Sequence, residues 1–519
     1  MHLTQGLRRS LQLQPSAAAV CFGTRRRTFR ELGARVARLA GALQALGMKV
    51  GDRVAMLALN SDRYLEYQLA VPWGGGVLNP CNTRWSPAEI AYSLQDSGTE
   101  ILIIDDGFTS VAPQIQHQAK VVREVIHAGE GNAPAGLHGY EALIEASAPV
   151  EDADRGGSDL AGVFYTGGTT GYPKGVMLSH TNLIASAFMG LAQGLIAPDA
   201  VCLHAAPMFH LVDFALAQMA WLNGSRHCVI PKFDAEAVLM CIARERVTDM
   251  LLVPTMLQML IDHPAMQAGH DFSSLARVTY AGSPISEMLL DRLMVAFPGV
   301  ALTQGYGMTE TAPMGTFLPA WHHTAEGRKA GKVRSAGRAT YGTLVRIVNE
   351  SDAELPRGTI GEITVKGPNV MLGYWNKPTE TAAALRNGWM HTGDAGYMDE
   401  EGFIFVVDRL KDMIVSGGEN VYSAEVENAL AQHPAVAASA VIGVPDDRWG
   451  ERVHAVITCK PGAGATAQEL IAHCKQLIAG YKCPRSVEFR EALPLSGAGK
   501  VLKSELRKPF WDGRTRQVS

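Results

Sequence analysis

Short, almost entirely apolar runs alternate with segments of helical periodicity along most of the chain. Apolar runs of this kind are typical of parallel strands that are covered on both faces. The runs predicted to be strands are "DRVAMLAL" (52–59), "EILIID" (100–105), "AGVFYT" (161–166), "TDMLLVP" (248–254) and "RVTYAG" (277–282). The segments with helical spacing of apolar residues are 28–46, 179–195, 234–246 and 284–297. This alternation predicts an α/β architecture with mostly parallel sheets.

The pattern changes after about residue 335, where turn residues separate short strands and little helix is visible. The segments 342–349, 361–367 and 402–408 predict a small antiparallel β unit. The end of the chain returns to an α/β pattern, with helices expected over 423–432 and 467–479 and strands over 436–442 and 452–459. The charged segment "DRLKDM" (408–413) lies between these regions. We therefore predict an N-terminal domain over 1–408, with a β-rich subdomain over 336–408, and a C-terminal domain over 409–519.

Composition and charge narrow the possible partners. The chain has 519 residues, of which 47% are hydrophobic and 19% are charged, and its formal net charge is −4. This balance gives no support for nucleic acid as the main partner. No apolar run approaches the ~18–20 residues that a membrane helix requires, so we expect no transmembrane segment.

The cysteines and the N-terminus both bear on location. The eight cysteines are scattered and form no CxxC pair, which fits reduced thiols in a cytoplasm better than a disulfide framework or a zinc site. The first thirty residues contain several arginines and no acid, as transit peptides do. However, "AAAVCFG" and the segment after it already read as a strand and an amphipathic helix. We therefore expect no cleaved signal and a cytoplasmic location.

The segment "YTGGTTGYPKGVMLSH" (165–180) concentrates glycine, threonine and one lysine. Glycines allow backbone N–H groups to face a ligand, threonines add hydroxyl donors, and Lys174 adds a positive charge, which together suit a polyphosphate. The spacing differs from the usual phosphate loop, because Pro173 precedes Lys174 and Gly175 follows it. Taken alone, the segment is equally compatible with a flexible surface turn.

Five distant segments decide between these readings. They are "YAGSPIS" (280–286), "QGYGMTE" (304–310), a long stretch from "GWMHTGD" to "SAEVE" (388–427), "VIGVPDDRWGERV" (441–453) and "PLSGAGKVLKSELR" (494–507). In this order the set resembles the acyl-adenylate-forming enzymes, which include acyl-CoA synthetases, adenylation domains of peptide synthetases and luciferases. The resemblance spans nearly the whole chain. It departs at Gly167, where many members have serine, although glycine is familiar there among fatty acyl-CoA ligases.

The resemblance implies a two-step reaction and a matching fold. A carboxylic acid and ATP give acyl-AMP and pyrophosphate, and CoA then gives acyl-CoA and AMP. The expected fold is a large N-terminal domain of stacked, mostly parallel sheets with helices and a small antiparallel β-barrel-like unit, followed by a small mobile α+β C-terminal domain. ATP, Mg²⁺ and the co-substrate CoA are the expected small-molecule partners, and a homodimer is a sensible default.

The resemblance also assigns the nucleotide site residue by residue. The positions expected to bind ATP or AMP are Thr166, Gly167, Gly168, Thr169, Thr170, Lys174, Gly282, Ser283, Gln304, Gly305, Tyr306, Gly307, Met308, Thr309, Asp394, Arg409 and Lys500. Tyr306 is expected against adenine, with a core aromatic as the alternative, and Asp394 is expected to accept from ribose hydroxyls.

Four residues are the expected catalytic group. Lys500 matches the family's catalytic lysine and would neutralise charge while a carboxylate approaches a polyphosphate. Glu310, together with Thr170, is expected to ligate Mg²⁺, a hard cation that prefers oxygen ligands, and Thr309 to donate to the α-phosphate. His210 would gate the acyl pocket or contact the carboxylate, and a satisfied core histidine is an equally open reading. His210 with Asp213 would make only a weak metal pair, because no third ligand is evident.

Further expectations concern CoA and the acid. Lys411 occupies the family's hinge position, and Gly417 and Gly418 would border a narrow channel for the thiol. The expected acyl pocket consists of His210, Phe214, Ala281, Gly305, Gly307 and Met308. Its apolar surroundings favour a fatty acid of medium chain or longer, or an aromatic acid, over acetate.

Three alternatives to an acyl-CoA ligase stay open at this point. A stand-alone adenylation enzyme would load the acyl group onto a carrier protein, and measuring AMP release with CoA against carrier protein would separate the two. A non-catalytic nucleotide-binding protein is disfavoured by Lys500, Glu310 and Asp394 occurring together. A luciferase-like oxygenase shares the motifs but requires a special substrate.

Overall fold

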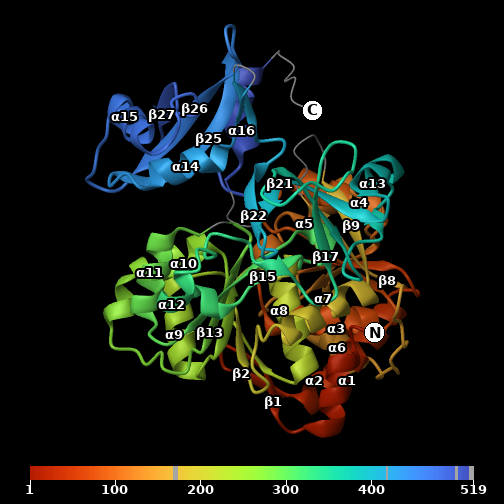
Figure 1. Ribbon diagram of the computed structural model, residues 1–519. Helices are drawn as coiled ribbons and strands as arrows, with labels where there is room; N and C mark the ends of the chain where they lie inside the picture. Colours follow the sequence, from red (N-terminus) through yellow and green to blue (C-terminus); the bar gives the residue numbers. More distant parts are fainter. Residues whose placement is uncertain (167–172, 284, 417–418, 497–500, 513–519) are drawn as a thin grey trace. The chain divides into compact units, whose positions relative to one another are not determined.

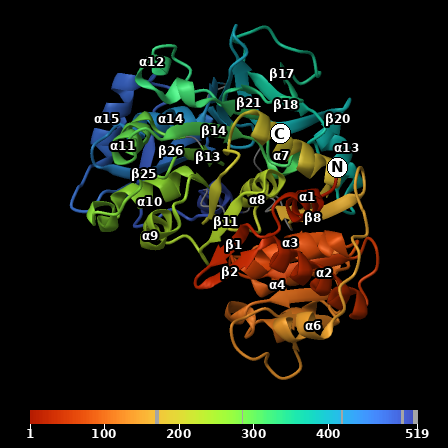
Figure 2. The same cartoon turned by 90° about the horizontal axis from the view of Figure 1, so that it is seen from below.

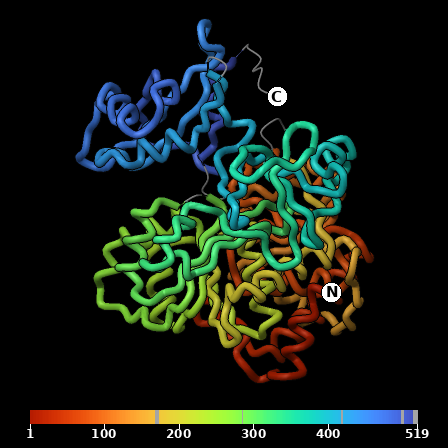
Figure 3. The backbone as a smooth tube through the Cα atoms, viewed as in Figure 1, coloured from red at the N-terminus to blue at the C-terminus, as the bar shows by residue number. Residues whose placement is uncertain are grey.

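The computed structural model describes residues 1–166, 173–283, 285–416, 419–496 and 501–512 (Figure 1). The chain forms two compact units. The first comprises Met1–Val345 and Val365–Met390, and the second comprises Arg346–Thr364 and His391–Ser519. Figure 3 follows the backbone through each unit. The domain boundary that the sequence suggested at residue 408 stays a prediction.

A nine-stranded sheet runs through the first unit. Its strands, in spatial order, are β16 (Arg338–Ala339), β15 (Thr316–Leu318), β14 (Ala301–Tyr306), β13 (Arg277–Ala281), β12 (Asp249–Leu252), β10 (Val201–His204), β11 (Arg226–Val229), β1 (Ala18–Phe22) and β2 (Arg25–Thr28). The strands from β14 to β1 pair in parallel, and antiparallel strands flank them on both sides. This agrees with the expectation of mostly parallel sheets.

An eight-stranded sheet belongs to the same unit. Its strands, in spatial order, are β19 (Gly373–Tyr374), β9 (Lys174–Ser179), β8 (Leu160–Thr166), β4 (Val77–Pro80), β3 (Arg53–Leu57), β5 (Ile101–Ile104), β6 (Glu124–His127) and β7 (His138–Gly139). The strands from β8 to β7 are parallel, whereas β9 and β19 are antiparallel. The pairing of β9 with β19 places the strand that follows the glycine-rich segment beside residues 373–374, a much later part of the chain.

Helices cover these sheets. The helices of the first unit are α1 (Gln5–Leu13), α2 (Phe29–Ala45), α3 (Asp62–Trp73), α4 (Pro87–Ser97), α5 (Ala112–Gln118), α6 (Tyr140–Ala146), α7 (His180–Ala192), α8 (Leu211–Asn223), α9 (Ala235–Glu245), α10 (Pro254–Asp262), α11 (Glu287–Ala296), α12 (Ala325–Arg328) and α13 (Pro378–Ala384), with short 3₁₀ turns η1 (Asp106–Phe108), η2 (Pro264–Gln267), η3 (Thr309–Thr311) and η4 (Ala320–His323). Figure 2 shows α2, α3 and α4 grouped together, in red to orange. One buried cluster joins residues of both sheets with α2, α3 and α8, and a second joins β10–β13 with α9–α11. The sheets are thus stacked with helices between them.

Local sequence signals explain where several helices begin. The Thr28 hydroxyl oxygen accepts a hydrogen bond from the backbone N–H of Glu31 at the start of α2, and the Glu31 carboxylate accepts one from the backbone N–H of Thr28. Ser86 and Glu89 form the same reciprocal cap at α4. Such caps satisfy backbone donors that have no partner inside the helix. Gly224, with φ of 74°, ends α8 in the left-handed region that favours glycine.

The second unit carries a five-stranded sheet with three helices, and strands of a second small sheet. The first sheet has the order β24 (Glu419–Val421), β23 (Ile414–Ser416), β26 (Gly450–Cys459), β25 (Val436–Asp446), with β27 (Ser486–Phe489) pairing β26, and its helices are α14 (Ser423–Ala431), α15 (Ala467–Leu477) and α16 (Lys503–Trp511). The other sheet has the order β17 (Leu344–Val348), β18 (Gly361–Lys366), β21 (Trp389–Met398), β20 (Leu385–Arg386), with β22 (Ile404–Arg409) pairing β21. Antiparallel pairing of β21 with β20 and β22 agrees with the predicted β unit. Within the described ranges, no helix has the length and apolar character needed to cross a membrane.

Candidate active site

The glycine-rich segment connects two strands of a hairpin. Strands β8 and β9 are antiparallel, with Tyr165 opposite Gly175 and Thr166 opposite Lys174. The hydroxyl of Tyr165 donates to the Asp96 carboxylate over 2.6 Å, which attaches the end of β8 to α4. Residues 167–172 between the strands, including the predicted phosphate contacts Gly167, Gly168, Thr169 and Thr170, lie outside the described residues. The hairpin thus fixes Thr166 and Lys174 as a facing pair at the two ends of this segment.

Tyr374 joins Lys174 to Glu310. The Lys174 ammonium lies 5.2 Å from the centre of the Tyr374 ring, within the range of a cation–π contact. The Tyr374 hydroxyl donates to Glu310 Oε1 over 2.9 Å. Both side chains of this hydrogen bond are buried, with 9% of Tyr374 and 7% of Glu310 exposed. Burial and the adjacent Glu310 carboxylate both raise the pKa of Tyr374, so its hydroxyl keeps the proton that it donates.

The reasoning from sequence did not find Tyr374. Its position follows from the pairing of β19 with β9, which sets Tyr374 opposite Val176 and Gly373 opposite Met177. The backbone N–H of Trp375 then donates to the carbonyl of Gly175 over 2.7 Å. The short strand β19 carries no periodic pattern of its own, so no local signal in the sequence indicates this partner.

Glu310 lies on the 3₁₀ turn η3 (Thr309–Thr311), which is held from both sides. Its backbone carbonyl accepts a hydrogen bond of 2.9 Å from the N–H of Met371. The amide of Asn369 donates to the carbonyl of Thr311 over 2.8 Å and also to that of Met314. These bonds fix the backbone that carries the predicted metal ligand Glu310 and the neighbouring Thr309.

The predicted adenine and acyl residues gather at the carboxyl ends of two adjacent strands. In the parallel pair β13–β14, Ala281 lies opposite Gly305 and Tyr280 lies opposite Gln304. Since parallel strands end at the same edge of a sheet, Gly282, Ser283 and Tyr306 follow at neighbouring strand ends. The structure therefore brings these predicted residues together.

Three glycines at this edge have different physical requirements. Gly282 has φ of 87°, a backbone conformation that side chains rarely adopt. A Cβ on Gly307 would lie 1.9 Å from the carbonyl oxygen of Pro313, so the backbone itself excludes a side chain there. A Cβ on Gly305 would make ordinary van der Waals contacts, at 3.9 Å, with Ala281 Cβ and Met314 Sδ, so this position has room for a Cβ.

His210 immediately precedes α8. Its N–H donates to the Pro207 carbonyl over 3.0 Å, and its own carbonyl accepts from the N–H of Phe214 over 3.1 Å. The ring of His210 packs on Phe209 at 4.3 Å between centroids. Phe214 is buried and meets Phe164 of β8 edge to face at 5.5 Å. The two predicted pocket residues thus share one helix end, in an aromatic environment.

Asp213 does not pair with His210 but with His204. The Asp213 carboxylate lies 2.9 Å from Nδ1 of His204, whose Nε2 lies 2.9 Å from Nδ1 of His227. All three side chains are fully buried, and burial holds the pKa of His227 well below its ordinary value. Within the described ranges, His210 and Asp213 belong to no cluster of three metal ligands, so the weak metal pair gains no support.

The second unit holds the predicted ribose pair. Asp394 of β21 lies opposite Arg409 of β22 in register, and Arg409 Nε is 2.7 Å from Asp394 Oδ1. Asp394 is buried, with 5% exposed. The N–H of Leu410 donates to the Gly393 carbonyl over 2.9 Å, which keeps the ends of the two strands together. The two residues that the sequence assigned to one ligand are therefore brought into direct contact.

The predicted hinge residue Lys411 follows this pair. Burial, followed by repulsion from Arg409, lowers the pKa of Lys411 below its ordinary value. Arg507 of α16 donates to the Lys411 carbonyl over 3.4 Å and pairs with Asp412 at 2.6 Å. The predicted channel residues Gly417 and Gly418 lie outside the described residues.

Lys500 also lies outside the described residues, but the chain on both sides of its segment is anchored. Leu495 and Val501 form an antiparallel bridge, and the N–H of Leu502 donates to the Pro494 carbonyl over 2.8 Å. Lys503 then pairs with the half-buried Glu427 at 2.7 Å. Burial alone would lower the pKa of Lys503, but the carboxylates of Glu427 and Asp408 raise it, so the lysine stays charged.

Comparisons with known proteins agree on one family. The model described as "AMP-binding enzyme" matches residues 7–375, and that described as "AMP-binding enzyme C-terminal domain" matches residues 425–500. A feruloyl-CoA synthase from an Amycolatopsis species is 41% identical over 97% of this chain and 98% of its own. The fatty acid–[acyl-carrier-protein] ligase ScoC of Streptomyces coeruleorubidus is 35% identical over 98% of this chain and 96% of its own. The crystal structure of ATP-bound MatB from Rhodopseudomonas palustris superimposes with a TM-score of 0.88 at 32% identity, covering 99% of this chain and 100% of MatB.

Proposed function

This chain belongs to the AMP-binding enzymes, in their acyl-CoA synthetase branch, and we propose that its acid substrate is aromatic or a fatty acid of medium chain or longer. The protein is an ATP-dependent acid–thiol ligase with ATP and CoA as substrates. The acid and ATP form acyl-AMP and pyrophosphate, and CoA then displaces AMP to give acyl-CoA.

An aromatic acid with an unsaturated side chain, as in ferulate, is the first candidate. The 41% identity to a feruloyl-CoA synthase supports this choice. The absence of a side chain at Gly305 and the aromatic contact of Phe214 with Phe164 also favour a bulky, apolar acid over acetate. Fatty acids stay in the proposal because a medium/long-chain fatty acid–CoA ligase of Mycobacterium tuberculosis is 34% identical.

The contact of Tyr374 with Lys174 and Glu310 is the observation that carries the proposed nucleotide site. It links a cation at the end of the glycine-rich segment to a buried carboxylate. We assign Lys174 to phosphate oxygens, Thr309 to the α-phosphate and Tyr306 to the adenine ring. Anchored donors of this kind stabilise developing charge without reorganising during the reaction.

Mg²⁺ is the proposed metal, and the chemistry of Glu310 fits it. A carboxylate is the ligand type that Mg²⁺ prefers beside phosphate oxygens, and Glu310 is buried on an anchored turn. When bound, the ion would offset the charge of the departing pyrophosphate. Glu310, with Thr170, would hold it.

Lys500 is the proposed catalytic lysine of the first step. Its ammonium would attract both the attacking carboxylate and the α-phosphate, which otherwise repel each other. Asp394, oriented by Arg409, would accept hydrogen bonds from ribose hydroxyls. We further propose that the chain turns at Lys411 after the first step, so that Gly417 and Gly418 replace Lys500 beside the incoming thiol.

A carrier protein is the second candidate thiol acceptor. The observation that favours it is the 35% identity to an acyl-carrier-protein ligase over nearly the full chain. Both acceptors present the same phosphopantetheine thiol, so the first half-reaction is the same for each.

One assay set tests the reaction, the acid and the acceptor. The enzyme is incubated with ATP, Mg²⁺ and a panel of hydroxycinnamates, octanoate, palmitate and acetate, with CoA or a phosphopantetheinyl carrier protein. We expect AMP and pyrophosphate in equal amounts, thioester with CoA, and the highest kcat/KM with the aromatic acids. ADP and phosphate as products would refute the acyl-adenylate route, and preference for acetate would refute the proposed substrate class.

Two further expectations complete the proposal. The eight cysteines are all free thiols, which supports action in a reducing compartment such as the cytoplasm. A homodimer stays a proposal that a measurement of mass in solution decides.

A further inference from the structure

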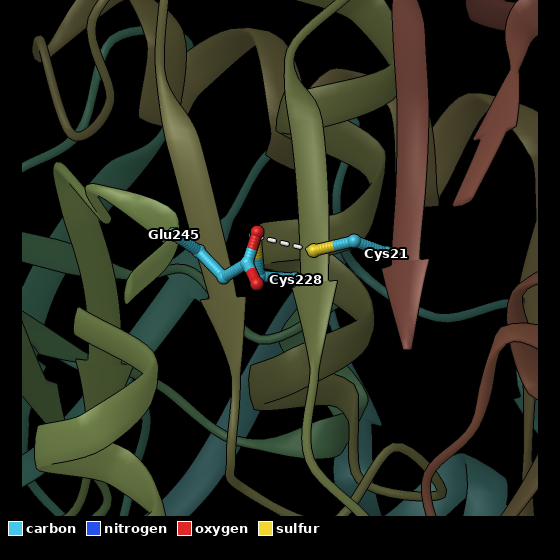
Figure 4. A group of neighbouring side chains, drawn as sticks. All are labelled: Cys21, Cys228 and Glu245. Atoms are coloured by element: carbon cyan, nitrogen blue, oxygen red, sulfur yellow. Dashed lines mark hydrogen bonds between the residues drawn. The ribbon is translucent and has the colours of Figure 1, made fainter. Parts of the chain in front are cut away.

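Cys21, Cys228 and Glu245, which come from three separate elements, meet in the first unit, away from the residues assigned above, and Cys241 lies on the same helix as Glu245. Cys21 of β1 and Cys228 of β11 are direct partners in a parallel pair, so their side chains point to the same face of the nine-stranded sheet. Cys241 and Glu245 lie one turn apart on α9, which places them on one helix face. Figure 4 shows Cys21, Cys228 and Glu245 turned toward one another.

The donor atoms are close together. The Cys21 thiol donates to Cys228 Sγ over 2.8 Å. One atom each from Cys21, Cys228 and Glu245 lies within 4.8 Å of the others. Among the residues that the structure describes, this is the single group of at least three metal-ligating side chains. The scattered cysteines of the sequence suggested no zinc site, because the contact of Cys21 with Cys228 arises only from the pairing of β1 with β11.

Burial distinguishes this group from an exposed acidic cluster. The exposed fractions are 2% for Cys21, 0% for Cys228, 3% for Cys241 and 6% for Glu245. Soft thiolate sulfur with one carboxylate is a donor set typical of Zn²⁺ and related d¹⁰ cations, and not of Mg²⁺ or Ca²⁺. A site built from these residues would therefore exclude the metal proposed for catalysis.

Two arginines fix the orientation of Glu245. Arg26 Nη2 and Arg244 Nε lie 2.7 Å and 2.8 Å from the same oxygen, Oε1. Both guanidinium groups therefore contact the same oxygen of the Glu245 carboxylate. The side chains of Arg26 and Arg244 are themselves 45% and 59% exposed, so the group lies just beneath the surface.

The charges balance for a divalent ion. Three thiolates and one carboxylate carry four negative charges, and the two guanidinium groups and one divalent cation carry four positive charges. A neutral, fully paired group avoids the large penalty for an unpaired charge in a protein interior. With any one of the three thiols missing, the buried group would keep a net positive charge.

We propose that Cys21, Cys228 and Glu245 supply three ligands of a tetrahedral binding site for a thiophilic divalent cation of the zinc type, and that Cys241, which lies outside this group in the structure, turns in from α9 as the fourth ligand. Binding releases the three thiol protons to solvent, and three metal–sulfur bonds and one metal–oxygen bond form. Zinc–sulfur bonds of about 2.3 Å require ligand sulfurs roughly 3.8 Å apart in a tetrahedron. The sulfurs of Cys21 and Cys228 therefore separate by about 1 Å, a change that rotation of their side chains supplies. The bound ion would join β1, β11 and α9, and its role is structural.

Cadmium provides a direct test with the intact protein. The reduced, chelator-treated protein is titrated with Cd²⁺ alone, and the thiolate charge-transfer absorption in the ultraviolet is followed. We expect saturation at one equivalent per chain, displacement by Zn²⁺, and an X-ray absorption spectrum that fits three sulfur ligands and one oxygen ligand. A rise in Tm with Zn²⁺ concentration should accompany binding.

Matched variants identify the ligands. Cys228→Ala should abolish the stoichiometric absorption, whereas Cys81→Ala should keep it, because Cys81 is equally buried in the same unit but lies outside the group. Glu245→Gln should weaken Cd²⁺ binding at least tenfold. If Cys228→Ala fails to fold, the ligand count on the wild-type protein still decides the proposal. Absence of stoichiometric binding by the reduced wild type, unchanged binding in Cys228→Ala, or a Cys21–Cys228 disulfide whose reduction yields no metal affinity would each overturn it.

Discussion

Replacing Tyr374 with phenylalanine tests the proposed nucleotide site with the removal of a single hydroxyl group. That hydroxyl donates to Glu310 Oε1 over 2.9 Å, while the ring beside the Lys174 ammonium stays in place. The variant therefore separates the support of Glu310 from the contact with Lys174. Since both partners of the hydrogen bond are buried, water does not readily replace the lost donor.

The expected magnitude follows from the type of bond. A hydrogen bond to a charged group contributes about 1.5–3 kcal/mol, and loss of this support during acyl-AMP formation corresponds to roughly 10- to 150-fold in rate. We expect kcat for pyrophosphate release to fall within this range, and the Mg²⁺ concentration for half-maximal rate to rise. Thioester formation from supplied acyl-AMP and CoA should change little, because the metal serves the first step.

A second buried tyrosine supplies the matched control. The Tyr140 hydroxyl donates to Glu66 Oε2 over the same distance, 2.9 Å, at a carboxylate that pairs with Arg35 outside the candidate site. Tyr140→Phe and Tyr374→Phe should both lower the free energy of unfolding, but only Tyr374→Phe should slow adenylation. A double-mutant cycle with Glu310→Gln should show less than additive losses if Tyr374 acts through Glu310.

The refuting results are specific. Wild-type pyrophosphate release and wild-type Mg²⁺ dependence in a folded Tyr374→Phe protein would show that the hydroxyl does not support the reaction. Equal losses in Tyr140→Phe and Tyr374→Phe would assign the effect to stability. Fully additive losses in the Tyr374→Phe, Glu310→Gln double variant would show that the two side chains act independently of each other.

Three further predictions concern other parts of the molecule. Lys500→Ala should slow acyl-AMP formation at least ~100-fold, which corresponds to about 2.7 kcal/mol of transition-state stabilisation, yet leave thioester formation from supplied acyl-AMP near the wild-type rate. Equal losses in the two half-reactions would argue against domain alternation. Gly305→Ala should fold, because an added Cβ makes only ordinary contacts, at 3.9 Å, with Ala281 and Met314, and should lower kcat/KM for aromatic acids more than for short ones; an unchanged ratio would remove Gly305 from the acyl pocket. Burial lowers the pKa of His323 from 6.5 to about 4. Between these pH values the unfolded chain therefore binds a proton at this histidine that the folded chain does not bind. The free energy of unfolding should fall by about 3 kcal/mol in total as the pH is lowered through this range. His323→Gln should reduce this loss in denaturant titrations at pH 7 and pH 5, and an identical pH dependence would contradict it.

Local signals account for the elements that the sequence predicted well. The helix expected over 28–46 is α2 (Phe29–Ala45). Its start is fixed by the cap between Thr28 and Glu31, two residue types that can be recognised as a cap in the sequence itself. The strand expected over 100–105 is β5 (Ile101–Ile104), which is buried on both faces. An apolar run does not reveal its partners, however. β8 pairs in parallel with β4 on one side and in an antiparallel hairpin with β9 on the other.

Long-range pairing explains what the sequence could not predict about the site. Tyr374 reaches Lys174 and Glu310 only because a two-residue strand adds to β9. Cys21 and Cys228 meet only because β1 joins the sheet beside β11. In each case the decisive neighbour is set by strand order, which depends on packing of the whole unit and not on the residues nearby in sequence.

The two buried carboxylates of the proposed site differ in the group that orients them, and this difference matches their proposed roles. Glu310 accepts from a neutral tyrosine hydroxyl, so this contact leaves its negative charge available to a cation. Asp394 is paired at 2.7 Å with the guanidinium of Arg409, which offsets its charge while leaving an oriented acceptor. A divalent metal is attracted by net negative charge, whereas a ribose hydroxyl needs only a correctly directed acceptor. Exchanging the partners would impair both functions, because a guanidinium beside Glu310 would repel Mg²⁺ and an uncompensated Asp394 would repel the phosphates of ATP.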